Sequence, residues 1–110
     1  MSVKKMALLL DRIEYLTSEG KITWEITEKD DVFQTSFSNF SLRIYKGTTD
    51  YYISLHNSEG TLLESASDLD LLPEMADAFM RMQSLYESAR GYALGVEQAI
   101  DEILSELNED

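Results

Sequence analysis

The chain contains no cysteine, and it has only one histidine and one proline among its 110 residues. Without cysteine it forms no disulfide bond and offers no thiolate nucleophile, and with a single histidine besides, no zinc site is expected. Long hydrophobic runs are also absent. No segment approaches the ~20 apolar residues that cross a membrane, and the apolar run from Met6 to Leu10 falls short of the ~7–15 residues in a signal-peptide core. We therefore expect a soluble bacterial protein of the cytoplasm.

Recognisable catalytic and ligand-binding motifs are missing as well. His56 is the only obvious general base, and no Gly-x-Ser-x-Gly sequence presents a serine to it. Asp68 and Asp70 begin a calcium-loop pattern, but Leu72 and Pro73 stand where a further ligand and the central glycine are needed. The two aspartates are instead expected to cap a helix. We predict no catalytic residue, no metal site and no cofactor, and hence a protein that is not an enzyme.

Positive charge is scarce in one half of the chain. Residues 1–58 hold eight acids and seven bases, a net charge of −1, whereas residues 59–110 hold thirteen acids and two bases, a net charge of −11. Together they give the formal charge of −12. An acidic surface repels nucleic acid and anionic membranes and attracts basic surfaces. Nucleic acid and membranes are therefore not expected as partners, and a basic protein is.

Hydrophobic periodicity predicts a single α+β domain over residues 1–110. Apolar residues at steps of three and four predict an amphipathic helix over 3–17, with Ser2 as its cap and Gly20 in the following turn. Alternating residues between 22 and 65 predict a four- to five-stranded antiparallel meander, because successive strands are joined by short turns. The inward parity changes near Ser38–Asn39, which indicates a tight turn or a β-bulge there, and we favour a turn. One long bent helix or two helices are expected to complete the domain and to pack on the sheet.

The C-terminal third carries an apolar stripe with a period of 3.5 residues. Its members are Leu72, Met75, Phe79, Met82, Tyr86, Ala89, Ala93, Val96, Ile100, Ile103 and Leu107. One helix over 72–107 would be ~54 Å long, whereas a compact chain of this size has a radius of gyration of only ~13 Å. Either the helix breaks near Gly91–Gly95 and folds back, or it projects and finds a partner. The mostly apolar positions beside the stripe favour a break or sharp bend over a long coiled coil.

Four acids on the outward side of this segment are the candidate partner-binding residues: Glu97, Asp101, Glu102 and Glu106. They form two like-charge pairs four residues apart, each unfavourable by ~0.2–0.5 kcal/mol. Acids near a helix C-terminus also oppose the macrodipole. Since the arrangement does not favour helix stability, either solubility or recognition of a basic partner explains it.

The order of segments resembles a loose group of small bacterial α+β proteins to which no activity is assigned. The resemblance covers most of the chain and rests on the first helix and on Lys21–Ile26, Phe33–Phe37, Tyr51–Leu55 and Leu85–Arg90. It implies a fold and no site residues. Size and charge are also similar to those of immunity proteins, antitoxins and type III secretion chaperones, an analogy from composition.

The leading hypothesis is a non-enzymatic protein-binding module, an inhibitor, immunity or chaperone-like protein. It would use the acidic face of its C-terminal helix against a basic partner. The alternative is a structural or assembly protein that forms a homodimer through the 72–107 stripe, with the acids serving solubility. An enzyme of unfamiliar type would have His56 as its candidate base.

Overall fold

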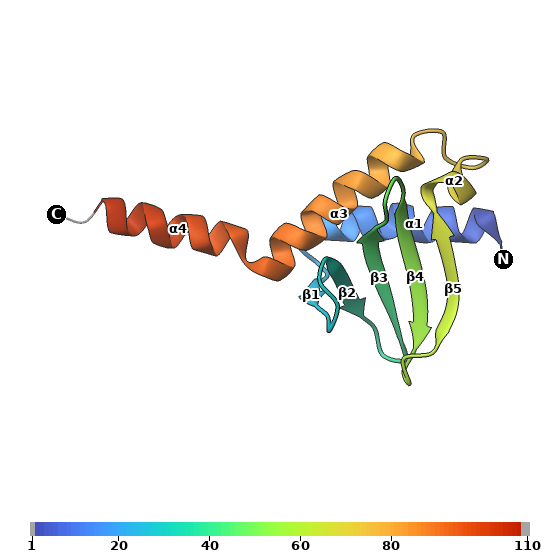
Figure 1. Cartoon of the computed structure of the whole chain (residues 1–110), viewed down its shortest axis with the longest axis horizontal. Coiled ribbons are helices and arrows are strands. Elements are labelled where there is room, and N and C mark those ends of the chain that lie inside the picture. The colour runs from blue at the N-terminus through green and yellow to red at the C-terminus, as the bar shows by residue number, and fades with distance from the viewer. Residues whose placement is uncertain (1, 109–110) are drawn as a thin grey trace.

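The α+β fold predicted from the sequence is confirmed by a computed structural model, which describes residues 2–108 (Figure 1). An N-terminal helix precedes a five-stranded antiparallel sheet, and helices follow it. In chain order the elements are α1 (Val3–Ser18), β1 (Glu25–Ile26), β2 (Val32–Ser36), β3 (Phe40–Lys46), β4 (Tyr51–Asn57), β5 (Leu62–Ser67), α2 (Asp68–Leu71), α3 (Ala78–Leu94) and α4 (Val96–Leu107). Within 2–108 every helix is too short or too polar to traverse a lipid bilayer.

The sheet is a meander in which each strand pairs with its neighbours in the sequence, in the order β1-β2-β3-β4-β5. Leu42 on β3 lies opposite Thr35 on β2 and Leu55 on β4. The tight turn predicted near Ser38–Asn39 is present, because the Phe37 N–H donates a 2.8 Å hydrogen bond to the carbonyl of Phe40. This turn carries the change of parity while keeping the apolar residues of both strands on one face.

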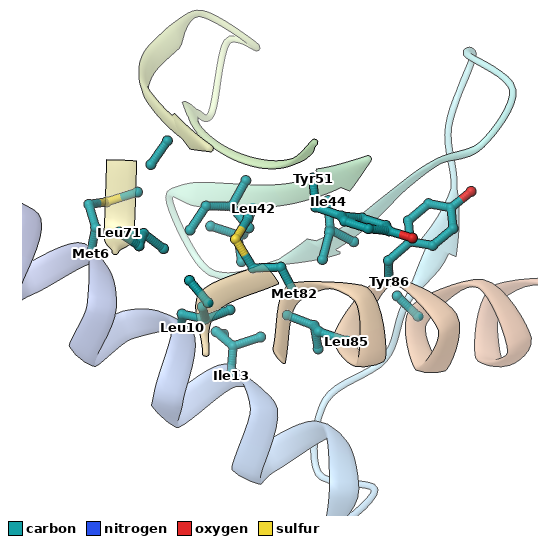
Figure 2. Packing of buried hydrophobic residues seen from close by; sticks show 14 of the residues in the cluster. Met6, Leu10, Ile13, Leu42, Ile44, Tyr51, Leu71, Met82, Leu85 and Tyr86 are labelled. Atoms are coloured by element: carbon teal, nitrogen blue, oxygen red, sulfur yellow. The ribbon is translucent and has the colours of Figure 1, made fainter. Parts of the chain in front are cut away.

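Helices α1 and α3 cover one face of the sheet and enclose the core with it (Figures 1 and 2). The helix predicted over 3–17 forms because its apolar residues share one side, and because the Ser2 hydroxyl accepts the Lys5 N–H at its start. The largest fully buried side chains come from all layers: Trp24, Leu10, Leu42, Ile44, Ile53, Leu71, Met82 and Thr35. The core therefore lies between the two helices and the middle strands.

The first strand is shorter than the sequence pattern predicts. Alternation suggests a strand from Ile22 to Ile26, but β1 contains only Glu25 and Ile26. The Trp24 side chain is 2% exposed, and its indole Nε1 donates a 3.0 Å hydrogen bond to Oγ1 of Thr17 on α1. This anchor holds the segment before β1 against α1 instead of in the sheet.

The start of the C-terminal helical region also differs from expectation. The stripe and Pro73 suggest a helix from about residue 72, but α2 ends at Leu71 and α3 begins at Ala78. Ser67 is the N-cap of α2, and Asp70 completes its capping box. Asp68 does not cap the helix: its buried Oδ1 accepts the N–H of Tyr51 at 2.9 Å. That bond ties α2 to the start of β4.

The break predicted in the 72–107 helix lies at Gly95. This glycine adopts the left-handed conformation, with φ 67° and ψ 37°, and separates α3 from α4. Helix α3 buries its half of the stripe in the core, including Met82, Tyr86 and Ala89. Helix α4 does not fold back, and it extends away from the sheet (Figure 1). The described chain consequently measures 58 × 33 × 27 Å.

Candidate protein-binding site

Helix α4 is an amphipathic helix without a packing partner in the described chain. None of its residues is buried, although the segment is continuous with the buried helix α3. Gly95 sets this direction: its N–H bonds back to the end of α3, while its carbonyl accepts the Ala99 N–H as the first hydrogen bond of α4. One left-handed residue thus ends one helix and starts the next, so α4 leaves the body as a separate element.

The apolar side of α4 is open to solvent. Its members, which we call the α4 stripe, are 38% to 72% exposed: Val96, Ile100, Ile103, Leu104 and Leu107. On a helix of ~3.6 residues per turn they fall on one side. A helix of a globular domain normally buries such a side against its own core. A contiguous exposed apolar patch of this kind is typical of a site where another surface docks.

The four predicted acids lie on both flanks of the stripe. At ~100° per residue, Glu97 and Asp101 form one row beside Leu104, and Glu102 and Glu106 form a second row on the other side. All four side chains are exposed. Within residues 2–108 no lysine or arginine lies within ion-pair distance of any of them. The centre of the polar side is uncharged, being occupied by Gln98 and Ser105.

The sequence therefore predicted these four residues and the stripe, but not their arrangement as two acidic rows around an apolar centre. Glu109 and Asp110, which add to the acidity of the sequence here, lie outside the described residues. A hollow of ≈ 600 Å³ at the junction of α3 and α4 continues the surface toward the body of the protein. Its lining includes Tyr92, Val96 and Glu97.

His56 lies on the face of the sheet that no helix covers. Its Nε2 is 2.9 Å from the hydroxyl of Ser54, and its Nδ1 is 3.4 Å from the carbonyl of Gly60. Ser54 is only 3% exposed, and it lines a hollow of ≈ 310 Å³ together with His56, Arg43 and Lys29. The partner of Nδ1 is a backbone carbonyl and not the carboxylate that orients a catalytic histidine. In residues 2–108, no group of three or more His, Asp or Glu side chains is placed to hold a metal ion.

An ion-pair cluster between α1 and α3 was not predicted from the sequence. Asp77 and Arg81 are four residues apart, a spacing typical of an ordinary pair on one helix, but their contact is 4.0 Å, whereas Arg81 lies 2.7 Å from both Asp11 and Glu14. Burial raises the pKa of Glu14, and the hydrogen bond and charge of Arg81 oppose that rise. Only the tertiary structure brings these residues together, so no local pattern signals the cluster. Its role is to hold the two covering helices together.

A second apolar surface was also not predicted. Leu9 of α1, Phe37 of the β2–β3 turn and three residues of the sheet, Phe40, Leu42 and Leu55, line a pocket of ≈ 300 Å³, which we call the α1–sheet pocket. Phe37 and Phe40 are 44% and 48% exposed. The helices cover one end of the sheet, and the strands extend past them at the other end (Figure 1). The alternation of apolar residues in the sequence predicts on which face of the sheet these side chains lie. It does not predict that the helices leave this end of the face uncovered.

Comparison with known proteins adds no family to this description. No family model matches the chain, and neither a curated protein nor a solved structure is found to match it. The resemblance to a loose group of small bacterial proteins stays a prediction, and the function is inferred from the surface of the molecule.

Proposed function

We propose that the protein is a non-enzymatic protein-binding module that presents α4 to an apolar groove with basic rims on a partner. The observation that carries this proposal is the exposed α4 stripe with an acidic row on each flank. Insertion of an amphipathic helix into a hydrophobic groove is a recurrent mode of protein recognition. The charges favour grooves that place lysine or arginine beside at least one acidic row.

The stripe supplies the favourable free energy of such a contact. Complete burial of an isoleucine, leucine or valine side chain contributes ~1.5–3 kcal/mol. All five stripe side chains remain available for this, because none of them is buried in the described chain. Part of the gain is offset by the ordering of α4, since a helix of 12 residues is marginally stable by itself in water.

The acidic rows supply orientation and selectivity. Complementary charge accelerates encounter and suppresses wrong partners more than it strengthens a finished complex. Exposed charge interactions are also screened by salt. Binding through α4 should therefore be fast at low ionic strength and slower at high ionic strength, while the apolar contact keeps the complex formed.

The alternative function, a homodimer along the whole 72–107 stripe, would use a stripe of which four of the eleven residues are buried. Met75, Met82, Tyr86 and Ala89 pack in the core of their own chain and are at most 7% exposed. A coiled coil over five heptads would have to unpack α3 from the sheet. What remains exposed of the stripe is Leu72, Phe79 and the part on α4.

The test compares capture of proteins from a host lysate by three forms of the full chain. The first is the wild type, the second neutralises the rows (Glu97→Gln, Asp101→Asn, Glu102→Gln, Glu106→Gln), and the third interrupts the stripe (Ile100→Ser, Ile103→Ser, Leu107→Ser). A matched control neutralises four exposed acids elsewhere: Glu19→Gln, Asp30→Asn, Glu59→Gln and Glu74→Gln. The proposal expects one captured protein to be lost with both α4 variants and kept with the control. Capture that is unchanged in both α4 variants contradicts it.

A further inference from the structure

The chain itself carries a pocket whose chemistry matches α4. The α1–sheet pocket is lined only by apolar side chains, Leu9, Phe37, Phe40, Leu42 and Leu55. It opens to solvent beside Phe37 and Phe40, whose rings are about half exposed. An amphipathic helix needs such a surface for its apolar side. The α4 stripe and this pocket are therefore two unpartnered apolar surfaces on one molecule.

Opposite charges accompany the two surfaces. Helix α1 carries Lys4, Lys5 and Arg12, and within residues 2–108 no carboxylate lies within ion-pair distance of any of them. The acids of the same helix, Asp11 and Glu14, are held by Arg81. Helix α4 carries four acids and no base. The cations of α1 and the anions of α4 can stabilise each other only if the two helices come into contact.

Two of these cations, Lys5 and Arg12, lie beside the pocket-lining residue Leu9 by helical spacing. Lys5 precedes Leu9 by four residues and Arg12 follows it by three, so all three lie on neighbouring positions of one side of the helix. The guanidinium of Arg12 lies over the ring of Tyr15, 5.8 Å from its centroid, and remains exposed. On the side of the pocket opposite α1, the acidic residue Glu64 pairs with Leu55 in the β4–β5 register. One acidic row of α4 would therefore face α1, and the other would lie on the side of Glu64.

Charge also distinguishes between two ways in which two copies of the chain could associate. Contact of α4 with α4 would bring eight acids together, four from each copy, with no base on either helix. Contact of α4 with the α1–sheet pocket brings the acids to the lysines and arginine of α1. A single contact by a helix of ~18 Å is small, whereas a stable dimer buries ~800 Å² on each partner. If each copy docks its α4 on the other copy, the contact area is doubled and the α4 stripes of both copies are covered.

We propose that α4 of one copy docks in the α1–sheet pocket of a second copy, and that the exchange is reciprocal and gives a two-fold dimer. The inference rests on the proposed function of α4 and identifies the partner surface as that of the same chain. The α1 side of this pocket is basic even though the whole molecule is acidic. Because each copy offers both a helix and a pocket, the two halves of the contact can be removed separately.

The experiment uses two variants, each lacking one half. A chain that ends at Gly95 keeps the pocket and lacks α4, and it should fold because no residue of α4 is buried. The variant Phe37→Ser/Phe40→Ser keeps α4 and loses the exposed rings of the pocket. Sedimentation equilibrium is expected to show a wild-type dimer, a monomer for each variant alone, and a 1:1 heterodimer when the two variants are mixed. The mixed dimer has one contact instead of two and should dissociate more readily than the wild type.

A charge exchange gives a second readout that leaves the pocket lining unchanged. Lys5→Glu/Arg12→Glu alters exposed residues of α1 only, and it should abolish the dimer. Mixing it with Glu102→Lys/Glu106→Lys should restore association, because the charges are then exchanged across the contact. The matched control is Lys21→Glu/Lys46→Glu, which reverses two exposed lysines outside α1 and should leave the dimer intact. Circular dichroism verifies that each variant is folded.

Three outcomes overturn the inference. They are a wild-type chain that stays monomeric at every concentration, a chain without α4 that dimerises like the wild type, and a folded Phe37→Ser/Phe40→Ser variant that dimerises like the wild type. Each is distinguishable from failure of the proposed function. If the chain is monomeric but lysate capture still depends on α4, the helix binds a different protein and only the inference fails. If capture does not depend on α4, the proposed function fails by itself.

Discussion

The guanidinium of Arg81 on α3 lies 2.7 Å from Oε1 of Glu14 on α1. That contact is an ion pair without hydrogen-bond geometry, and Nε of Arg81 donates instead to Oε2 at 3.4 Å. Burial raises the pKa of Glu14, and Arg81 lowers it again by hydrogen bonding and by its charge. The same hydrogen bond is the main cause that raises the pKa of Arg81. The two helices that cover the sheet are thus joined by a pair whose charge is pH-dependent on one side.

Replacement of Arg81 by Met should raise the pKa of Glu14 further, because the effects that oppose burial disappear. An acid with a raised folded pKa contributes stability at pH values below its ordinary pKa of 4.5, and this contribution is lost as pH rises through the folded pKa. We therefore expect the variant to lose about 1.5 kcal/mol at neutral pH and less at acidic pH. Carbon-detected NMR titration of the Glu14 carboxyl and urea unfolding at several pH values measure both effects.

The matched control for this prediction is Arg90→Met. Arg90 is exposed on the same helix and forms no ion pair within residues 2–108. It should leave the pKa of Glu14 and the unfolding free energy nearly unchanged. Adding Glu14→Gln to Arg81→Met should remove the extra pH dependence, since the titrating group is gone. An unchanged Glu14 titration in Arg81→Met would show that the pair has no energetic role.

Substitution of Thr17 by Val should destabilise the fold through Trp24. The variant preserves the shape of the side chain but removes the acceptor of a buried indole N–H. An unsatisfied buried donor costs ~1–3 kcal/mol. Urea unfolding followed by fluorescence reports on this site directly, because Trp24 is the only tryptophan. Thr17→Ser keeps the hydroxyl and should retain most of the stability; equal losses in both variants would assign the effect to packing alone.

Replacement of Gly95 by Ala should shift α3 and α4 toward one continuous helix. The left-handed φ of 67° suits glycine and is unfavourable by ~1 kcal/mol for other residues. The added methyl group meets no close neighbour, the nearest atom being Oε1 of Gln98 at 3.6 Å. The effect is therefore conformational and not steric. Cα chemical shifts at residue 95 should move from left-handed to right-handed helical values, and persistence of left-handed values would contradict the prediction.

Neutralisation of Glu102 and Glu106 should stabilise α4 in the monomer. The two acids are four residues apart on the helix, so their like charges repel each other. They also lie near the C-terminal end of the helix, where the macrodipole disfavours negative charge. Glu102→Gln/Glu106→Gln should slow amide exchange in α4 by a few tenths of a kcal/mol in opening free energy. Exchange in α3 should not change, because its stability comes from the core. Slower exchange in both helices would mean that α4 packs on the body of the protein.

Local sequence patterns predicted most of the fold. The amphipathic spacing over 3–17 fixes the apolar side of α1, and alternation with a parity change at Ser38–Asn39 fixes the face and turn of β2 and β3. These features depend on residues close together in the chain, so they can be inferred from the sequence. The break between α3 and α4 at Gly95 is of the same kind, because only glycine adopts its left-handed conformation readily.

Other features were decided by tertiary structure. The Trp24–Thr17 hydrogen bond shortens β1, and Arg81 binds acids on α1 in place of its neighbour Asp77. The candidate site shows the difference most clearly. Met82 and Ile103 belong to the same apolar stripe in the sequence, but Met82 is buried on α3 and Ile103 is exposed on α4. Periodicity determines which side of a helix is apolar; the sheet area left after α1 and α3 have packed determines whether that side is covered.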